Sequence, residues 1–401
     1  MTMDYFIKTK TPIWTGGIEG ICDTIHETGI IGSMRWWYEV VLRGLDVFAC
    51  DPTSAEQRCP NEITIGNQKQ NQWCNACDLF GMTGRQRKFK INIIRGNPVY
   101  QPKEIGDDER INIKPSNPPR DTGWYLRAGR ISSKKGLSFT ITSLATPEPT
   151  QKVKVLLCLL SKWAGIGARQ QHGYGIFEIL DENNEPISIT NDELNNFINE
   201  SVNPQGNQPP KRRTNGTALV LPNPNLKNFF FAKIKLTGLK DDWVNKLDGV
   251  PINTQQRANF NNWHAKHDSR IFAPAFKNQL RFVAFNGQYD KQKQLFGYIN
   301  LKNKEDKSGA KINVSHAYVE EGDLEVRVWG EIVQNHSCLC NEMYVALNNI
   351  DYWKAATGSE TVIPQLIEWR EINGSVRCKI DSKACNAPCN KVETFLKCLL
   401  T

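Results

Sequence analysis

The spacing of hydrophobic and polar positions divides the N-terminal part of the chain into strands and helices. The segment MDYFIKTKTPIWTGG alternates like a strand and ends at two glycines. From about Gly32 to Leu45, hydrophobic residues recur at intervals of three and four, which predicts an amphipathic helix that Ser33 could cap. FKINIIRG, LSFTITSLA and YGIFEIL predict further strands, and TQKVKVLLCLLSKWAGIG predicts a second helix that runs to Gly165.

The resulting order of strand, helix, two strands, helix and strand is typical of a ferredoxin-like domain. We therefore predict an α+β protein made of two ferredoxin-like (RRM-like) domains. The first covers residues 1–182, with a cysteine-containing insertion at about 46–80 after its first helix, and the second, also α+β, covers residues 218–401. Residues 183–217 turn polar and rich in Asn and Pro, which favours a linker between them.

The second half has a less regular pattern. FFFAKIKLTG, QLRFVAFNG, QLFGYINLKN and LEVRVWGEIV each suggest a strand, whereas ETVIPQLIEWREI suggests a helix. In the first half, the proline-rich and charged stretch PKEIGDDERINIKPSNPPRDTG predicts a long loop.

Composition limits the class of protein. Of 401 residues, 39% are hydrophobic and 11 are Trp, which is enough for folded cores. The net charge of +8 suits a polyanionic partner but also a slightly basic enzyme. No window approaches the ~18 apolar residues of a membrane span, and MTMDYFIKTK lacks the apolar centre of a secretory signal. We therefore expect a cytoplasmic protein without membrane contacts.

Twelve cysteines in a reducing compartment indicate metal ligation or burial rather than disulfides. Cys74 and Cys77 form a C-x-x-C pair suited to tetrahedral zinc, and Cys50 and Cys59 could complete the site. The gap between the two upstream cysteines is longer than in a usual zinc knuckle, so buried thiols without metal stay an alternative. A second metal site could be formed by a later group whose C-x-C spacing is less specific, and which consists of His336, Cys338, Cys340, Cys378, Cys385 and Cys389.

The segment GIGARQQHGYGIF surrounds a polar stretch with two G-x-G pairs. A dinucleotide-binding loop would have a strand before its glycines and a helix after them, and here the order is reversed. A glycine-capped helix end explains Gly165 but leaves Gly173 and Gly175 unexplained, so we favour contact with an extended polyanion. On this interpretation, a β-branched residue at position 173 reduces binding more than folding. The candidate contacts are Gly165, Gly167, Arg169, Gln170, Gln171, His172, Gly173 and Gly175.

Basic residues interleaved with aromatic ones favour a surface for single-stranded nucleic acid. In GSMRWWYE, neighbouring side chains of a helix point about 100° apart, so Trp36 can be exposed while Trp37 is buried. A base could stack on Trp36 with Arg35 on a phosphate; the alternative is a Trp-rich core helix with a snorkelling Arg. Two more basic runs add Arg85, Arg87, Lys88, Arg127, Arg130, Lys134 and Lys135.

Together these segments resemble the RAMP superfamily of CRISPR-associated RNA-binding proteins. The family's loop GxGxxxxxGxG is matched by the two G-x-G pairs, and TPIWTGGIEG, IIGSMRWWYE and CNACDLFG are similar to the first RAMP subunit of type III-B (Cmr) effector complexes. The resemblance implies a non-catalytic subunit for antiviral defence. It would bind near the 3′ end of the CRISPR RNA and contact the guide–target duplex, other RAMP subunits and the large subunit.

Two alternatives stay open. A metal-independent endoribonuclease of the same superfamily could process CRISPR RNA with His26 or His172, although RWWYE favours the effector subunit. A zinc-stabilised scaffold would instead contact mainly protein. Salt discriminates between RNA and protein partners, because an RNA-driven interaction weakens steeply as counterions compete.

Overall fold

Alternation of buried and exposed side chains builds four N-terminal segments into one antiparallel sheet. Its strands are β1 (Thr2–Thr9), β4 (Phe89–Ile93), β7 (Leu137–Ser143) and β8 (Phe177–Leu180), in the order β4-β7-β1-β8. The computed structural model describes residues 2–17, 22, 24–54, 58–65, 68–94, 109–113, 122–126, 137–144, 146–203, 224–239, 269–270, 273–300, 302–303, 306–332, 337–372 and 391–400.

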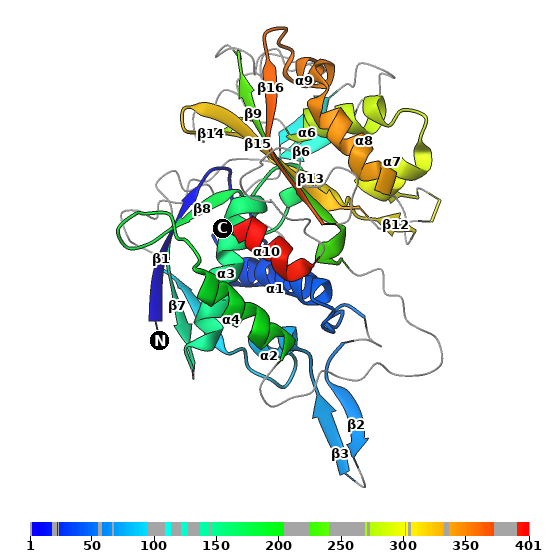
Figure 1. Cartoon of the computed structure of the whole chain (residues 1–401). Coiled ribbons are helices and arrows are strands. Elements are labelled where there is room, and N and C mark those ends of the chain that lie inside the picture. Colours follow the sequence, from blue (N-terminus) through cyan, green and yellow to red (C-terminus); the bar gives the residue numbers. More distant parts are fainter. Residues whose placement is uncertain are drawn as a thin grey trace.

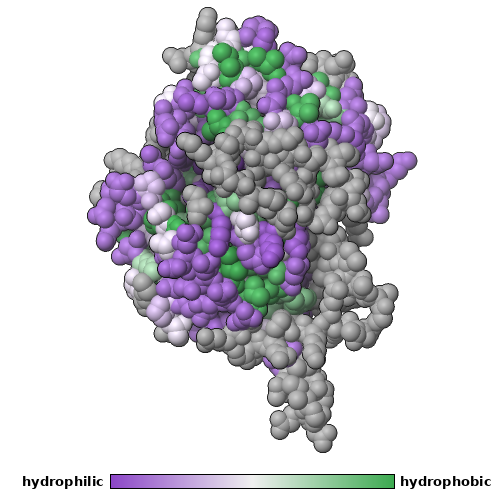
Figure 2. Space-filling model, in the orientation of Figure 1, coloured by the Kyte–Doolittle hydropathy of each residue, from purple (hydrophilic) through white to green (hydrophobic). Residues whose placement is uncertain are grey.

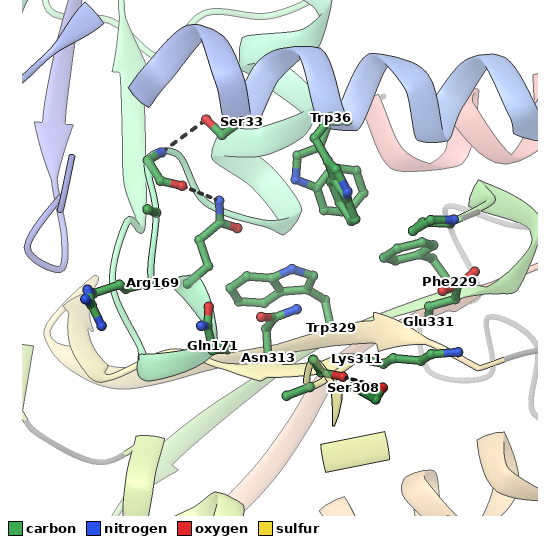
Figure 3. A pocket seen from close by; sticks show the side chains of 17 residues that line it. Ser33, Trp36, Arg169, Gln171, Phe229, Ser308, Lys311, Asn313, Trp329 and Glu331 are labelled. Atoms are coloured by element: carbon green, nitrogen blue, oxygen red, sulfur yellow. Dashed lines mark hydrogen bonds between the residues drawn. The ribbon is translucent and has the colours of Figure 1, made fainter. Parts of the chain in front are cut away.

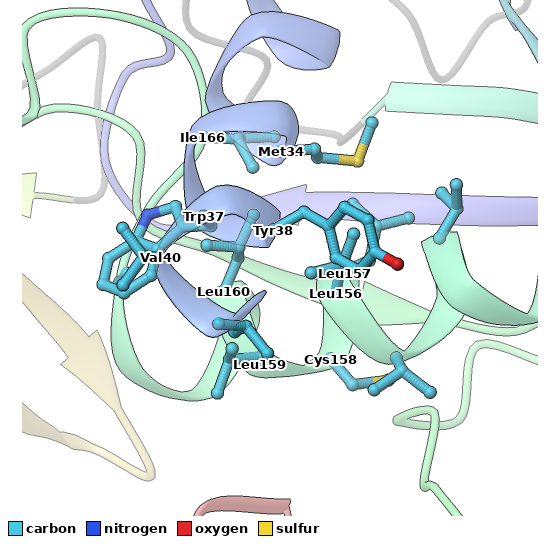
Figure 4. Close-up of a cluster of buried hydrophobic side chains, with 14 of the residues drawn as sticks. Met34, Trp37, Tyr38, Val40, Leu156, Leu157, Cys158, Leu159, Leu160 and Ile166 are labelled. Carbon is cyan, nitrogen blue, oxygen red and sulfur yellow. The ribbon is translucent and has the colours of Figure 1, made fainter. Parts of the chain in front are cut away.

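Two helices pack against each other on this sheet. α1 (Glu27–Gly44) directs Met34, Trp37 and Tyr38 toward the leucine-rich face of α3 (Glu148–Trp163), as Figure 4 shows. The predicted helices are thus confirmed, but α1 begins before Gly32. Its N-cap position is His26, so Ser33 is not the cap.

The region between α1 and β4 contains a hairpin and a short helix. Strands β2 (Asn61–Ile65) and β3 (Gln68–Gln72) form the hairpin, which projects from the lower end of the molecule in Figure 1, and α2 (Asn75–Phe80) follows it. Paired strands β5 (Glu109–Ile113) and β6 (Thr122–Leu126) also lie in and next to the stretch predicted as a loop, so that prediction was partly wrong.

Part of the segment predicted as a linker is a packed helix. α4 (Asn191–Val202) begins with a capping box. The Thr190 hydroxyl accepts from the backbone N–H of Glu193, and the Glu193 carboxylate accepts from the backbone N–H of Thr190. Lys154 of α3 pairs with Glu193 at 2.6 Å. Leu194, Phe197 and Ile198 are buried, so this helix is an additional cover for the first sheet's core.

A second antiparallel sheet forms the upper half of the molecule in Figure 1. Its path is β10-β14-β15-β9-β16, with β13 also paired to β15. The run β14-β15-β9-β16 repeats the order of the first sheet: second, third, first and fourth strand along the chain. The strands are β9 (Phe229–Thr237), β10 (Ser269–Arg270), β13 (Ile312–Val314), β14 (Ala317–Glu320), β15 (Asp323–Glu331) and β16 (Ile363–Glu371).

Two predictions in the second half were wrong, and a third, the strand in QLFGYINLKN, was right only for a two-residue strand. QLRFVAFNG continues α6 (Ala273–Gln279) as a π-helical turn, and QLFGYINLKN contains the end of α7 (Tyr289–Phe296) before short β11 (Tyr298–Ile299). Short apolar runs do not distinguish a buried helix from a strand. ETVIPQLIEWREI holds strand β16, whose register against β9 shifts between Leu366 and Glu368. That bulge breaks the two-residue alternation and produces helix-like spacing.

Helices from the end of the chain cover both sheets. α8 (Ser337–Asn348) and α9 (Ile350–Thr357) pack on the second sheet, whereas α10 (Val392–Leu400) returns to α3. The indole N–H of Trp163 donates to the Leu399 carbonyl at 2.6 Å. Residues from the two ends of the sequence therefore share one core.

The coloured part of the face in Figure 2 is largely hydrophilic, with smaller hydrophobic groups in both halves. Among the described residues, no helix is both long enough and apolar enough to cross a membrane.

Candidate nucleic-acid interface

The glycine loop, residues 165–176, is held by the segment that follows β1. The backbone N–H of Ala168 donates to the Trp14 carbonyl at 2.8 Å, and that of Gly175 donates to the Pro12 carbonyl at 2.9 Å. These bonds fix both ends of the loop against one short stretch of chain.

The same loop also contacts the second half of the molecule. The backbone N–H of His316, just before β14, donates to the Gly173 carbonyl at 3.1 Å. The ammonium of Lys277 in α6 donates to the Gln171 carbonyl at 3.0 Å. The loop therefore lies at the junction of the two sheets.

Packing within the protein accounts for the four glycines, all of which are buried. A Cβ added at Gly165, Gly167 or Gly175 would lie between 2.2 and 2.8 Å from a backbone oxygen. At Gly173, which has φ +97°, a Cβ would lie 2.7 Å from Nδ1 of His316. A substitution at position 173 is therefore expected to disturb folding, whatever its effect on binding. The candidate contact side chains of this loop lie in residues 168–172, between the two pairs of glycines.

Beside the loop is a cavity of about 470 Å³, bounded by α1 on one side and the second sheet on the other (Figure 3). Ser33 joins α1 to the loop, because its Oγ accepts from the Gly167 N–H at 3.1 Å. Trp36 is 40% exposed and lines the cavity, whereas Trp37 is 1% exposed, as the helical geometry predicted. Residues from the second half complete the walls: Phe229, Ser308, Gly309, Ala310, Lys311, Asn313, Trp329 and Glu331.

The lining combines aromatic, cationic and amide groups. Arg169, at φ +60°, holds its guanidinium 4.4 Å from the ring centroid of Trp14. Gln170 donates from its amide to the Gly167 carbonyl at 3.0 Å. Lys311 lies on the opposite wall, and burial raises the pKa of the Glu331 carboxyl. Such a lining can stack on a flat ring and hydrogen-bond its edge.

Arg35 lies on another side of α1 from this cavity. Its Nε donates to the Glu39 carboxylate at 2.9 Å, and its other nitrogens donate to the Gly81 carbonyl at 2.6 Å and to Sγ of Cys77 at 3.1 Å. Arg35 therefore does not line this cavity with Trp36, because adjacent helical residues point in different directions.

The basic run after α2 lies near the same place as Arg35. Arg85 and Lys88 both pair with Asp78, and Arg85 also stacks 4.0 Å from the ring centroid of Trp73. Arg87 is half-buried. These three candidates thus lie beside α2, outside the cavity lining.

The remaining candidates fall into three groups. His172 is half-buried in the 3-10 turn Gln170–His172, and His26 precedes α1. Cys340 is buried in α8, which also contains Cys338. Predicted residues outside the described part of the chain are Arg127, Arg130, Lys134, Lys135, His336, Cys378, Cys385 and Cys389.

The four cysteines of the predicted metal site come together next to Arg35. The sulfurs of Cys50, Cys59, Cys74 and Cys77 lie within 4.8 Å of one another, and all four residues are buried. Sulfurs at ~2.3 Å from a tetrahedral zinc are about 3.8 Å apart. Hydrogen bonds from the Cys50 and Cys59 thiols hold the pKa of Cys74 well below its usual range. The cluster is thus compatible with a bound metal.

Sequence reasoning missed the second-half wall of the cavity. The residues come from separate segments, and no spacing links Lys311 or Asn313 to α1. One usable signal was the alternation in LEVRVWGEIV, which places Trp329 and Glu331 on the same face of a strand.

Lys277 gives the junction a pH dependence. Burial, followed by the nearby charge of Arg281, lowers the pKa of Lys277 to about 7. Between that value and about 10.4, the unfolded chain holds a proton that the folded chain lacks. Stability should therefore rise with pH in this window by up to about 1.4 kcal/mol per unit. We expect Lys277→Gln to remove this rise of stability with pH. The free energies of unfolding of the substituted and unsubstituted chains, measured in urea at pH 7 to 10, should therefore diverge. Parallel curves for the two proteins would contradict it.

A match to a protein family supports the resemblance seen in the sequence. The family model of the RAMP superfamily matches residues 6–178, which confirms the resemblance for this part of the chain. A search of curated proteins found no match. Among solved structures, the chain is similar to the apo crystal structure of Cmr1 from Pyrococcus furiosus. The two share 14% identity and a TM-score of 0.36, over 83% of this chain and 88% of that one.

Proposed function

We propose that this chain, a RAMP-superfamily protein over residues 6–178, is a non-catalytic RNA-binding subunit of a type III-B CRISPR (Cmr) effector. It would hold the CRISPR RNA near its 3′ end, together with the guide–target duplex, and contact other RAMP subunits and the large subunit. The observation that carries the proposal is the position of the glycine loop, the segment typical of the family. Its side chains border a cavity with an exposed Trp and two cations.

The topology of both sheets supports this assignment. Each follows the strand order of a ferredoxin-like domain, with helices after the first and third strands. Sheets of this class are a common platform for single-stranded RNA. We therefore infer two ferredoxin-like domains, joined through the glycine loop.

Arg169 is the cation of the loop that we expect to contact a phosphate. Phosphate contacts carry no sequence information, so Arg169→Ala should weaken binding to unrelated single-stranded RNAs by a similar factor. Loss of one phosphate contact should also reduce the slope of log affinity against log salt by about 0.7. Fluorescence anisotropy at several salt concentrations measures both.

Lys291→Ala is the matched control, because Lys291 pairs with Glu342 at 2.6 Å away from the loop. The control should leave the slope unchanged. Absence of RNA binding by the unsubstituted chain, or a loss that depends strongly on sequence, would contradict the proposal. Metal-independent cleavage of CRISPR RNA that His172→Ala abolishes would favour the endoribonuclease instead.

We also propose that the four-cysteine cluster binds one structural zinc ion. The four buried sulfurs support this, since a tetrahedral sulfur set with all positions filled is typical of structural rather than catalytic zinc. Arg35 adds a compensating positive charge beside Cys77. Zinc would then hold together the base of the β2–β3 hairpin, which lies between Cys59 and Cys74.

A further inference from the structure

We propose that the cavity between α1 and the second sheet receives the base of one unpaired nucleotide, stacked on Trp36. This inference rests on the proposed RNA-binding function and specifies how the chain would engage a single residue of that RNA.

The dimensions suit one small planar ligand. At about 470 Å³ the cavity falls within the ~300–1,000 Å³ typical of small-molecule sites. Its walls come from α1, the glycine loop and the second sheet, and a duplex or a continuous stack of bases is larger than the space between them. A base that leaves the stack is the part of an RNA that fits.

Trp36 supplies the stacking surface. It is the large hydrophobic residue of α1 that stays exposed, whereas Met34, Trp37 and Tyr38 beside it are buried. Edge-on contacts fix its ring, with centroids 5.1 Å from Trp37 and 6.1 Å from Phe229. A pre-positioned aromatic ring stacks a base without losing further side-chain freedom.

Polar groups are placed to meet the edge and the phosphate of such a base. Figure 3 shows Trp36 on one wall and Trp329 with Asn313 on the other. The amides of Asn313 and Gln170 each offer donors and an acceptor, and the Glu331 carboxyl adds an acceptor. Arg169 and Lys311 stand at either side of the cavity, where the flanking phosphates would lie. A purely apolar side chain of a peptide would offer these polar groups no hydrogen-bond partner.

The test uses the full chain and single-stranded RNA oligomers, each with one abasic position, scanned along the sequence. The unsubstituted chain should lose about tenfold in affinity at one position and little at the others. Trp36→Ala should reduce affinity for the intact oligomer by a similar factor and abolish the position dependence. Trp36→Phe should restore part of it.

Tyr289→Ala is the control, because Tyr289 is an exposed aromatic residue, 70% accessible, outside the cavity lining. It should leave the scan unchanged. If Trp36→Ala fails to fold, Asn313→Ala gives the second readout: a changed preference among the four bases with an unchanged salt slope.

The outcomes separate this inference from the function on which it rests. Salt-dependent RNA binding with equal affinity at every abasic position would contradict the base-binding role of the cavity, but not the proposed RNA-binding function. No RNA binding by the unsubstituted chain would overturn both.

Discussion

Cys74→Ser is expected to release one zinc ion per chain and to lower the free energy of unfolding by about 4–5 kcal/mol or more, a range reached when a structural metal is lost. The reason is that the four sulfurs converge in the core from three separate stretches of chain. Without the metal, no bond between the sulfurs offsets the entropic cost of closing the long segment between Cys50 and Cys77. Elemental analysis gives the stoichiometry, and urea unfolding with and without a chelator gives the stability.

The control for this experiment is Cys398→Ser, since Cys398 is half-buried in α10 and lies outside the cluster. It should retain the metal and respond to chelator like the unsubstituted chain. Cobalt substitution adds a direct readout, because thiolate–cobalt bonds give charge-transfer absorption that Cys74→Ser would weaken. A metal-free native chain of unchanged stability would contradict the zinc proposal.

Gly173→Ala should lower the free energy of unfolding strongly. The added Cβ clashes with a side chain, that of His316, so a second substitution can remove the clash. A positive φ costs a non-glycine residue about 1–2 kcal/mol. At Gly173 the new Cβ also meets the buried ring of His316 at 2.7 Å, which we expect to add roughly 1–3 kcal/mol, as overpacking does elsewhere. Gly322→Ala isolates the first cost, because Gly322 has φ +87° and no atom within 4 Å of the added Cβ.

A double-mutant cycle makes the comparison sharper. His316→Ala removes the ring, so Gly173→Ala should cost less in that background than in the unsubstituted chain. Urea unfolding measures each step. Equal costs for Gly173→Ala and Gly322→Ala, together with a selective loss of RNA affinity, would return position 173 to the binding role first inferred from the sequence.

The first half could be predicted because each element carries its own period. The alternation in β1 and the three-and-four spacing in α1 and α3 are local properties, so those elements matched expectation. Residues 279–287 and 360–372 were assigned the wrong secondary structure, for opposite reasons. The first is a short apolar run that suits either state, and the second is a strand whose alternation a bulge interrupts.

The site could be predicted only where its residues are close together in the sequence. Helical geometry separated Trp36 from Trp37, and C-x-x-C spacing identified the cysteine cluster. The glycines were recognised, but the close packing at Gly167 and Gly173 was not, because their neighbours, the Trp14 carbonyl and the His316 ring, come from distant parts of the chain. Such contacts leave no periodic trace in the sequence.

The return of α10 to α3 has a consequence for how this protein is made. Trp163 and Leu399, which are hydrogen-bonded, are 236 residues apart in sequence. On the ribosome, α3 therefore waits for most of the chain before the part of its surface that α10 covers is buried, and contacts this non-local slow folding. A fragment that stops soon after residue 178 would expose the part of α3 that α10 covers, and would tend to aggregate. A fragment design that supplies residues 391–400 separately, as a peptide added in trans, is the natural way to recover it.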